Sequence, residues 1–125
     1  MKLHADAPSP LNTVTAYGPD FIEVNKTRHI GALLLLPDRL EAWPVTAFDD
    51  LAVEHFESLL SHAPELVLLG TGRRQRFPHP RLTRALTAAG IGVEVMDTAA
   101  ACRTYNILMA EGRRVAAALL PDSHE

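Results

Sequence analysis

Cysteine is almost absent from the sequence, and so is any apolar stretch long enough to cross a membrane. Cys102 is the only cysteine, so no intramolecular disulfide can form and disulfide-rich secreted scaffolds are excluded. The longest apolar runs, residues 30–36 and 115–120, fall far short of the roughly 20 residues that span a bilayer. Residues 1–6 show neither the apolar core of a signal peptide nor an arginine-rich transit sequence. We therefore expect a cytoplasmic protein without membrane insertion.

Lysine is scarce too, whereas arginine is not. Only Lys2 and Lys26 among the 12 Lys and Arg residues are lysines. The formal net charge of −3 argues against a nucleic-acid-binding protein. The excess of arginine has two interpretations. It reflects the base composition of the coding sequence, or several guanidinium groups hold carboxylates or small anions through their planar fork of donors.

The length and composition fit a single globular domain, residues 1–125. A chain of 125 residues with 47% hydrophobic residues can bury a core without a disulfide or a metal ion. Residues 1–11 contain Pro8, Ser9 and Pro10 in a row and are predicted to form a loosely held lead-in. Residues 121–125 are predicted to form a short tail.

The first half of the chain consists of short apolar segments separated by turn residues. The predicted strands are residues 12–17, 21–24, 27–36 and 40–43. Segment 27–36 ends in a continuous apolar run, which is typical of a strand that enters the middle of a sheet. This half is therefore predicted to be a β-meander.

The second half alternates helices with strands. Helices are predicted from Asp49 or Asp50 to about residue 62, at 80–89, and from the cap Asp97-Thr98 to about Ala110. The intervening strands are 66–69, 92–96 and 114–120. This alternation predicts parallel βαβ units that join the meander in one mixed sheet, an α/β fold.

The loop after strand 66–69 is the most suggestive segment for binding. It begins Gly70-Thr71-Gly72 and continues with Arg73 and Arg74, at the carboxyl end of a strand and before a helix, where α/β sheets usually bind ligands. Glycines expose backbone amides, and arginines donate to oxyanions. The spacing matches neither a P-loop nor a dinucleotide fingerprint. The alternatives are an anion or acidic-partner site and a structural turn with solvated arginines.

The helix that follows Asp97-Thr98 is nearly all small or apolar, yet it carries Arg103. If its strand runs parallel to strand 66–69, the helix starts at the same edge as the glycine loop. Arg103 then reaches back over that edge, pairs with Asp97 or Glu94, or extends along the surface to solvent. The small residues also permit close packing of helix on sheet, or of one subunit on another in a homodimer.

No catalytic residue, metal site or cofactor site emerges from the pattern. Cys102 stands near a helix start, which favours a thiolate, but no histidine near it in sequence supplies a base. His55 and His62 share a helix face without a third metal ligand. Neither a Gly-x-Ser-x-Gly elbow nor a pair of catalytic carboxylates occurs.

A set of short motifs distributed along the whole chain resembles a known family. The motifs are Tyr17-Gly18, Val24-Asn25, Leu33–Leu36 before Pro37, Trp43-Pro44, Gly70-Thr71-Gly72, residues 90–95, Asp97-Thr98, Ala101, Thr104-Tyr105-Asn106 and Glu111-Gly112-Arg113. The sequence resembles the bacterial branch of a family of small domains of unknown function. The family includes the mitochondrial NADH dehydrogenase assembly factor 3 and an adipogenesis-associated protein of animals.

The resemblance implies a three-layer α/β fold, with helices on the faces of a central mixed sheet and an additional small β layer from the N-terminal meander. It implies no established enzyme activity, and a role in protein assembly for one relative. It also maps the motifs Asp97-Thr98 and Tyr105-Asn106 onto the same edge as the glycine loop.

The leading functional hypothesis is a non-catalytic binding module, an assembly factor or adaptor for a protein partner not identified by the sequence. It needs no cofactor, and it holds an acidic peptide or a small anion. The predicted ligand-binding residues are Gly70, Thr71, Gly72, Arg73, Arg74, Asp97, Thr98, Arg103, Tyr105 and Asn106. The alternatives are a small hydrolase or transferase for an anionic metabolite, with Arg103 and backbone amides as oxyanion donors, and a purely structural subunit.

Overall fold

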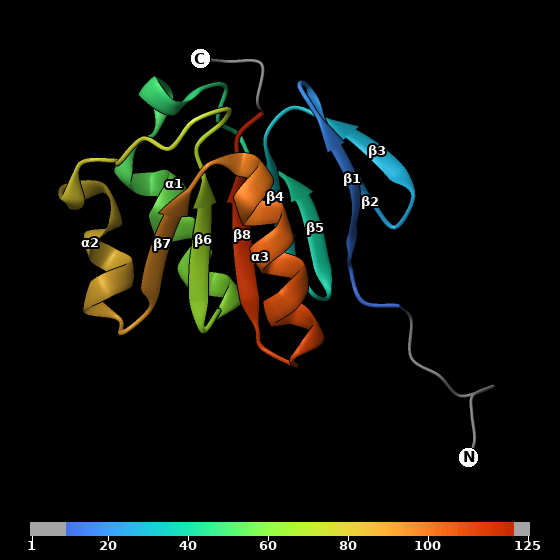
Figure 1. Cartoon of the computed structure of the whole chain (residues 1–125). Coiled ribbons are helices and arrows are strands. Elements are labelled where there is room, and N and C mark those ends of the chain that lie inside the picture. The colour runs from blue at the N-terminus through green and yellow to red at the C-terminus, as the bar shows by residue number, and fades with distance from the viewer. Residues whose placement is uncertain (1–9, 122–125) are drawn as a thin grey trace.

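The strands form two sheets (Figure 1). The structure is a computed structural model that describes residues 10–121, so most of the predicted lead-in 1–11 and tail 121–125 lie outside the described residues. A three-stranded antiparallel sheet has the order β1-β2-β3, and a five-stranded mixed sheet has the order β5-β4-β8-β6-β7. The strands are β1 (Val14–Gly18), β2 (Phe21–Val24), β3 (Thr27–Ile30), β4 (Leu33–Leu36), β5 (Arg39–Ala42), β6 (Leu66–Gly70), β7 (Gly92–Met96) and β8 (Val115–Leu119).

The helices connect the strands of the large sheet. They are the 3-10 helix η1 (Phe48–Asp50), α1 (Val53–Glu57), the 3-10 helix η2 (Ser58–His62), α2 (Pro80–Ala88) and α3 (Thr98–Ala110). β6 pairs in parallel with β7 and β8, whereas β4 pairs antiparallel with β5 and β8. A mixed sheet is therefore confirmed, but only β4 and β5 of the predicted meander join it, because β1–β3 form the separate small sheet.

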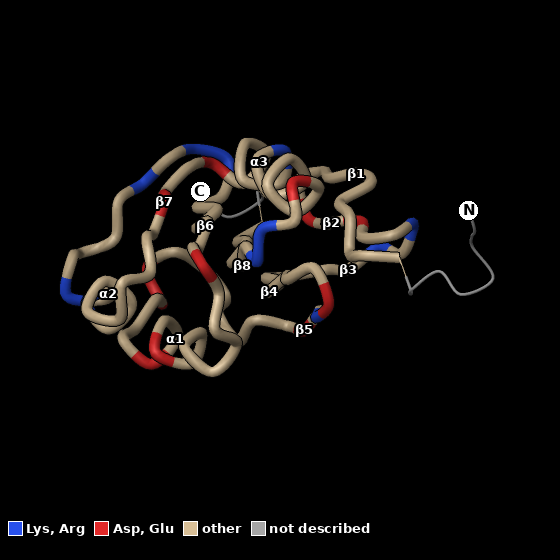
Figure 2. The backbone as a smooth tube through the Cα atoms, turned by 90° about the horizontal axis from the view of Figure 1, so that it is seen from below, with Lys and Arg blue, Asp and Glu red and all other residues tan. Residues whose placement is uncertain are grey.

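Two hydrophobic cores lie on opposite faces of the large sheet, because successive side chains of a strand point to opposite sides. Leu34 and Leu36 of β4 join the core beneath α1, η2 and α2. Leu33 and Leu35 join the core beneath α3 and the small sheet. Figures 1 and 2 show α3 beside the small sheet, with α1 and α2 on the other face. The three-layer architecture with an extra small β layer is confirmed.

Two predicted elements were wrong in their boundaries. Segment 27–36 is two strands in different sheets, because the chain turns at Gly31 with a φ of 91°, a conformation that glycine adopts without strain. The helix predicted to reach residue 62 is instead η1, α1 and η2, and the extended residues Leu51 and Ala52 separate η1 from α1. Ala52 caps α1, two residues beyond Asp50 and three beyond Asp49, and its backbone N–H donates to Nδ1 of His55 at 2.9 Å.

Arg114 joins the start of β8 to two neighbouring segments. Its Nη1 donates to Oδ1 of Asp38 at 2.9 Å, and its Nε donates to the carbonyl oxygen of His62 at 2.9 Å. The hydrogen bond from the Arg114 side chain lowers the pKa of Asp38. The hydrogen bond from the Arg114 backbone, followed by one from the Arg113 side chain, lowers the pKa of Glu65.

The Arg114–Asp38 pair predicts a pH-dependent stability. A carboxyl group whose pKa falls on folding stabilises the protein above its unfolded pKa, near 4, and loses this contribution as the pH falls. The difference in thermal midpoint between the wild type and Arg114→Gln should therefore shrink between about pH 6 and about pH 3. In an Asp38→Asn background the same difference should not vary with pH, and a persistent variation would contradict this assignment.

Candidate functional site

The Gly70-Thr71-Gly72 turn has the conformation that its glycines predict. A Cβ on Gly70 would come within 3.0 Å of Oγ1 and 3.1 Å of Cα of Thr98, so the first residue of α3 packs directly on the end of β6. Gly72 has a φ of 99°, which side-chain-bearing residues rarely adopt. Gly70 is therefore needed for the close approach of Thr98, and Gly72 is needed for its positive φ.

Two buried threonines tie the turn to the neighbouring strand ends. Thr71 is 1% exposed, and its Oγ1 donates to the carbonyl oxygen of Arg74 at 2.7 Å and accepts from the Arg76 N–H at 3.1 Å. Thr98 is 3% exposed; its Oγ1 donates to the carbonyl oxygen of Leu120 at 2.6 Å and accepts from the Gly72 N–H at 2.8 Å. These bonds fix the path of the loop at the carboxyl ends of β6, β7 and β8.

The backbone amides of this turn are engaged within the protein. The Thr71 N–H donates to the carbonyl oxygen of Met96 at 3.0 Å, and the Gly72 N–H donates to Thr98. Asp97 uses its side chain to cap α3, because Oδ1 accepts from the Ala100 N–H at 2.8 Å. Neither the Thr71 nor the Gly72 amide is therefore available to stabilise an oxyanion, which the alternative enzyme hypothesis required of backbone amides at this edge.

The loop beyond Gly72 presents basic and aromatic side chains. Figure 2 shows basic positions along the tube that leads from β6 to α2. Arg73 and Arg74 are exposed, and Phe77 is 72% exposed. The Arg76 guanidinium lies 4.2 Å from the ring centroid of Phe48, and its Nη2 donates to Oδ1 of Asp49 at 3.1 Å. The loop therefore combines a fixed backbone with an exposed aromatic ring and exposed cations.

Arg103 contacts the small sheet. Its Nη1 donates to the Tyr17 hydroxyl in β1 at 2.9 Å, rather than to Asp97 or Glu94. Five residues of helix rotate a side chain by about 140° relative to Thr98, which explains why Thr98 contacts the glycine turn while Arg103 points to β1. No hydrogen bond or ion pair identified within residues 10–121 joins Arg103 to the turn, and ligand binding by Arg103 stays a prediction.

Tyr105 and Asn106 fasten the N-terminal strand to α3. The Tyr105 hydroxyl, on a fully buried ring, donates to the carbonyl oxygen of Asn12 at 2.7 Å. Asn106 accepts from the Val14 N–H at 2.9 Å and donates to the Val14 carbonyl oxygen at 2.8 Å. Burial, with a smaller effect of Asp38, raises the pKa of Tyr105 far above its ordinary value, so the phenol remains a neutral donor. The structure thus separates this motif from the glycine turn.

Sequence reasoning missed Phe77 as an exposed residue, although its place among arginines and prolines was a usable signal. Within residues 10–121, no group of three His, Cys, Asp or Glu side chains is placed to hold a metal ion. Cys102 is buried at 1% exposure. No helix in the described part of the chain has the length and apolar character needed to cross a membrane.

Known proteins match the chain over most of its length. A family model described as "Protein of unknown function (DUF498/DUF598)" matches residues 14–120. An uncharacterized protein of Rhodobacter capsulatus is 40% identical over 108 residues, which cover 86% of this chain and 83% of that protein. A crystal structure of a Bordetella parapertussis protein is 51% identical with a TM-score of 0.87, covering 93% of this chain and 100% of that one.

One relative carries a name that states a function. The NADH dehydrogenase (ubiquinone) 1 alpha subcomplex assembly factor 3 of Bos taurus is 38% identical over 110 residues, which cover 86% of this chain. The match spans only 60% of the length of that relative. The similarity therefore covers only part of the bovine protein.

Proposed function

The chain belongs to the family of proteins of unknown function DUF498/DUF598, and from this premise we propose that it is a non-catalytic binding module that acts as an assembly factor or adaptor. A relative named as an assembly factor for an NADH dehydrogenase subcomplex supports this role. Because one fold can serve many functions, the proposal also needs a surface in this chain that suits a protein partner.

The loop of residues 72–79, called here the arginine–phenylalanine loop, is that surface. The observation that carries the proposal is Phe77, a large aromatic ring with 72% of its surface exposed, beside exposed Arg73 and Arg74. Aromatic residues and arginine dominate the binding energy of protein interfaces. Because Thr71 already fixes the loop backbone, little conformational entropy is lost when a partner binds.

The chemistry of the loop favours an acidic peptide over a small anion. The Thr71 and Gly72 amides that would surround an anion are bonded internally. Arginine side chains on an exposed loop instead form forked hydrogen bonds with carboxylates of a partner, while Phe77 provides apolar contact area. We assign to the partner an acidic segment with an apolar side chain next to its carboxylates.

A photo-crosslinking experiment tests this surface. With a benzophenone amino acid in place of Phe77, the protein should crosslink a specific partner in its host. The double change Arg73→Glu and Arg74→Glu should reduce that crosslink at least tenfold, because charge reversal at an interface centre costs about 2 kcal/mol or more. Mass spectrometry of the product should identify an acidic segment.

Two controls separate binding from folding. A benzophenone at exposed Thr87 of α2 should give no such product, and Arg84→Glu, an exposed arginine of the same helix, should leave the Phe77 crosslink intact. Equal crosslinking at both positions, or no loss on charge reversal with an unchanged thermal midpoint, would count against the arginine–phenylalanine loop as the binding surface.

A further inference from the structure

β5 is an edge strand whose outer side has no neighbouring strand in the sheet order of the described residues. Hydrogen-bonded and non-hydrogen-bonded pairs alternate along an antiparallel ladder. The Trp43 N–H donates to the carbonyl oxygen of Ala32 at 3.0 Å, so these two residues form a hydrogen-bonded pair. Counting along the ladder from there, Leu33 with Ala42 and Leu35 with Leu40 are non-hydrogen-bonded pairs. The peptide groups of Leu40 and Ala42 therefore face the outer edge and can pair with an added strand.

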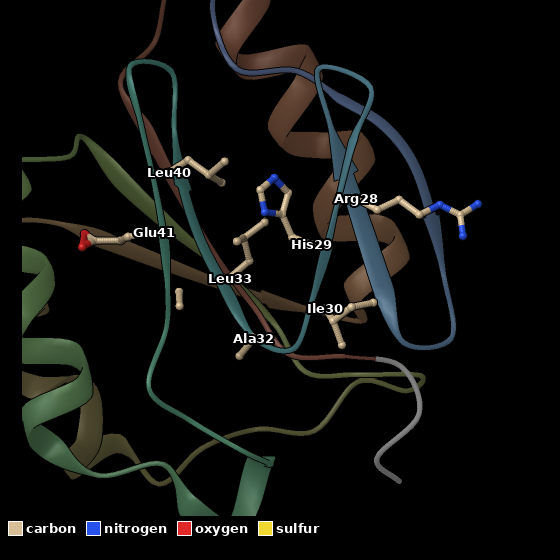
Figure 3. Close-up of a pocket in the computed structure, with 8 residues that line it drawn as sticks. Arg28, His29, Ile30, Ala32, Leu33, Leu40 and Glu41 are labelled. Carbon is tan, nitrogen blue, oxygen red and sulfur yellow. The ribbon is translucent and has the colours of Figure 1, made fainter.

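A pocket lies on one face of this edge, between β3 and the β4–β5 hairpin (Figure 3). It has a volume of about 390 Å³ and is lined in part by Ile30, Leu33 and Leu40. Figure 3 shows His29 reaching from β3 toward the hairpin, on the same side as Leu40, while Glu41 points to the opposite side of β5. The guanidinium of Arg28 points away from the cavity. This first pocket suits an apolar side chain.

A second pocket lies on the opposite face of the same edge, beside η2. Its volume is about 360 Å³, and Glu41, Trp43, Ser58, Ser61 and His62 are among the residues that line it. The hydroxyls of Ser58 and Ser61 donate to the carbonyl oxygens of His55 and Ser58, so their oxygens remain as acceptors. Nε2 of His62 lies 3.0 Å from Oε2 of Glu41. The Glu41 carboxylate is therefore already paired within the chain.

Each pocket is lined by a residue with a buried polar atom that has no hydrogen-bond partner. Among residues 10–121, Nε2 of His29 and Nε1 of Trp43 are the two buried side-chain nitrogen or oxygen atoms in that condition. Trp43 is only 4% exposed, and its indole N–H is a donor that must find an acceptor. Leaving such a group unsatisfied costs about 1–3 kcal/mol. Both unpaired atoms belong to residues that line the two pockets.

We propose that β5 is a strand-addition site for an extended segment of a partner protein, whose side chains enter the two pockets alternately. Neighbouring residues of an extended peptide point to opposite faces, as the two pockets require. An apolar side chain enters the pocket beside His29. An Asn or Gln enters the pocket beside Trp43, where its carbonyl accepts from the indole N–H and its NH2 group donates to the serine oxygens. Backbone hydrogen bonds give affinity, and the pockets give sequence preference.

A second copy of the chain fits the edge less well. Antiparallel self-pairing centred on Leu40 would place Arg39 opposite Glu41 of the other copy, yet Glu41 is already bonded by His62 and lies 3.9 Å from Nε of Arg39 in its own chain. In such a pair, the acceptor that self-pairing adds to the second pocket is the Glu41 carboxylate of the other copy, which its own His62 already contacts at 3.0 Å. An Asn or Gln side chain of a partner peptide would supply a neutral acceptor for the Trp43 indole N–H.

The site differs from the arginine–phenylalanine loop and goes beyond the proposed function. β5 is separated from β6, which precedes that loop, by β4 and β8 in the sheet. The two surfaces can therefore be inactivated independently, and failure of one proposal does not imply failure of the other.

Selection from a phage-displayed library of random ten-residue peptides, with the whole protein as bait, tests the proposal. We expect enriched peptides in which an apolar residue precedes or follows Asn or Gln. Binding should alter the fluorescence of Trp43, the single tryptophan of the chain. Ala42→Pro removes the outward N–H and should weaken binding at least tenfold, whereas Ala42→Ser, which keeps that N–H, should bind like the wild type.

Further variants keep the test decisive. If Ala42→Pro lowers the thermal midpoint, Ser61→Phe, which fills the second pocket from an exposed position, should weaken binding instead. Changing Arg73 and Arg74 to Glu should leave the selected peptides bound. The proposal is overturned if no peptide is enriched, if the peptides bind Ala42→Pro and Ser61→Phe like the wild type, or if the protein forms a dimer that Ala42→Pro dissociates.

Discussion

Replacing Thr98 with valine is expected to lower the free energy of unfolding by about 2–4 kcal/mol. The substitution keeps the shape of the side chain but removes its hydroxyl. The Gly72 N–H would then lose an acceptor at 2.8 Å, and the Leu120 carbonyl oxygen would lose a donor at 2.6 Å. Thr98 is only 3% exposed. Water therefore cannot readily reach the Gly72 N–H and the Leu120 carbonyl oxygen to replace the Thr98 hydroxyl. Urea denaturation followed by circular dichroism measures the loss.

The same change at an exposed threonine gives the reference. Thr87 lies on the outer face of α2, and its hydroxyl bonds only to carbonyls of its own helix. Thr87→Val should change stability by about 0.5 kcal/mol or less. Similar losses in the two variants would show that the Thr98 hydroxyl does not hold the strand ends together, and the rigid base of the arginine–phenylalanine loop would then need another explanation.

Asn106→Leu should cost about 2–3 kcal/mol and should loosen the small sheet before the rest of the protein. Asn106 satisfies both backbone groups of Val14, at 2.9 and 2.8 Å. Without these two hydrogen bonds, β1 loses its main polar attachment to α3. Hydrogen exchange monitored by NMR should show faster exchange in β1 and β2, with exchange in β6 and β8 little changed.

A change at the surface of the same interface serves as the control. Arg103→Gln removes the hydrogen bond to the Tyr17 hydroxyl, but both side chains are exposed, and such bonds contribute about 1 kcal/mol or less. It should leave exchange in β1 nearly unchanged. If Asn106→Leu and Arg103→Gln gave the same exchange pattern, the buried amide would not be what fastens the small sheet.

Local patterns in the sequence were sufficient to predict most of the architecture. The all-apolar segment 66–69 and the apolar end of segment 27–36 predicted strands, and β6 and β4 there are almost wholly buried. Boundaries failed where one glycine or one backbone kink overrode the apolar pattern, as at Gly31 and at Leu51. The pattern of apolar residues cannot reveal a turn inside a continuous apolar stretch, because it records which side chains are buried and not the direction of the chain.

The candidate site was predictable in part. The glycine turn and its two arginines follow from local sequence, because glycine spacing and strand ends are local features. The roles of Tyr105 and Asn106 depend on Asn12 and Val14, more than 90 positions away, and no local pattern encodes such a contact. The motif was placed on the correct helix but assigned to the wrong neighbour, since the direction of a helical side chain depends on what packs beside it.

The order of strands in the large sheet affects how the chain folds while it is being synthesised. Of the strands in residues 10–121, β8 is the last in sequence, yet it lies between β4 and β6. A ribosome therefore releases two half-sheets with unpaired inner edges, and only the emergence of residues 115–119 joins them. Until then the leucines of β4 and β6 lack the strand that separates them, and exposed strand edges of this kind favour aggregation. A host would benefit from a chaperone that shields the nascent chain during that interval.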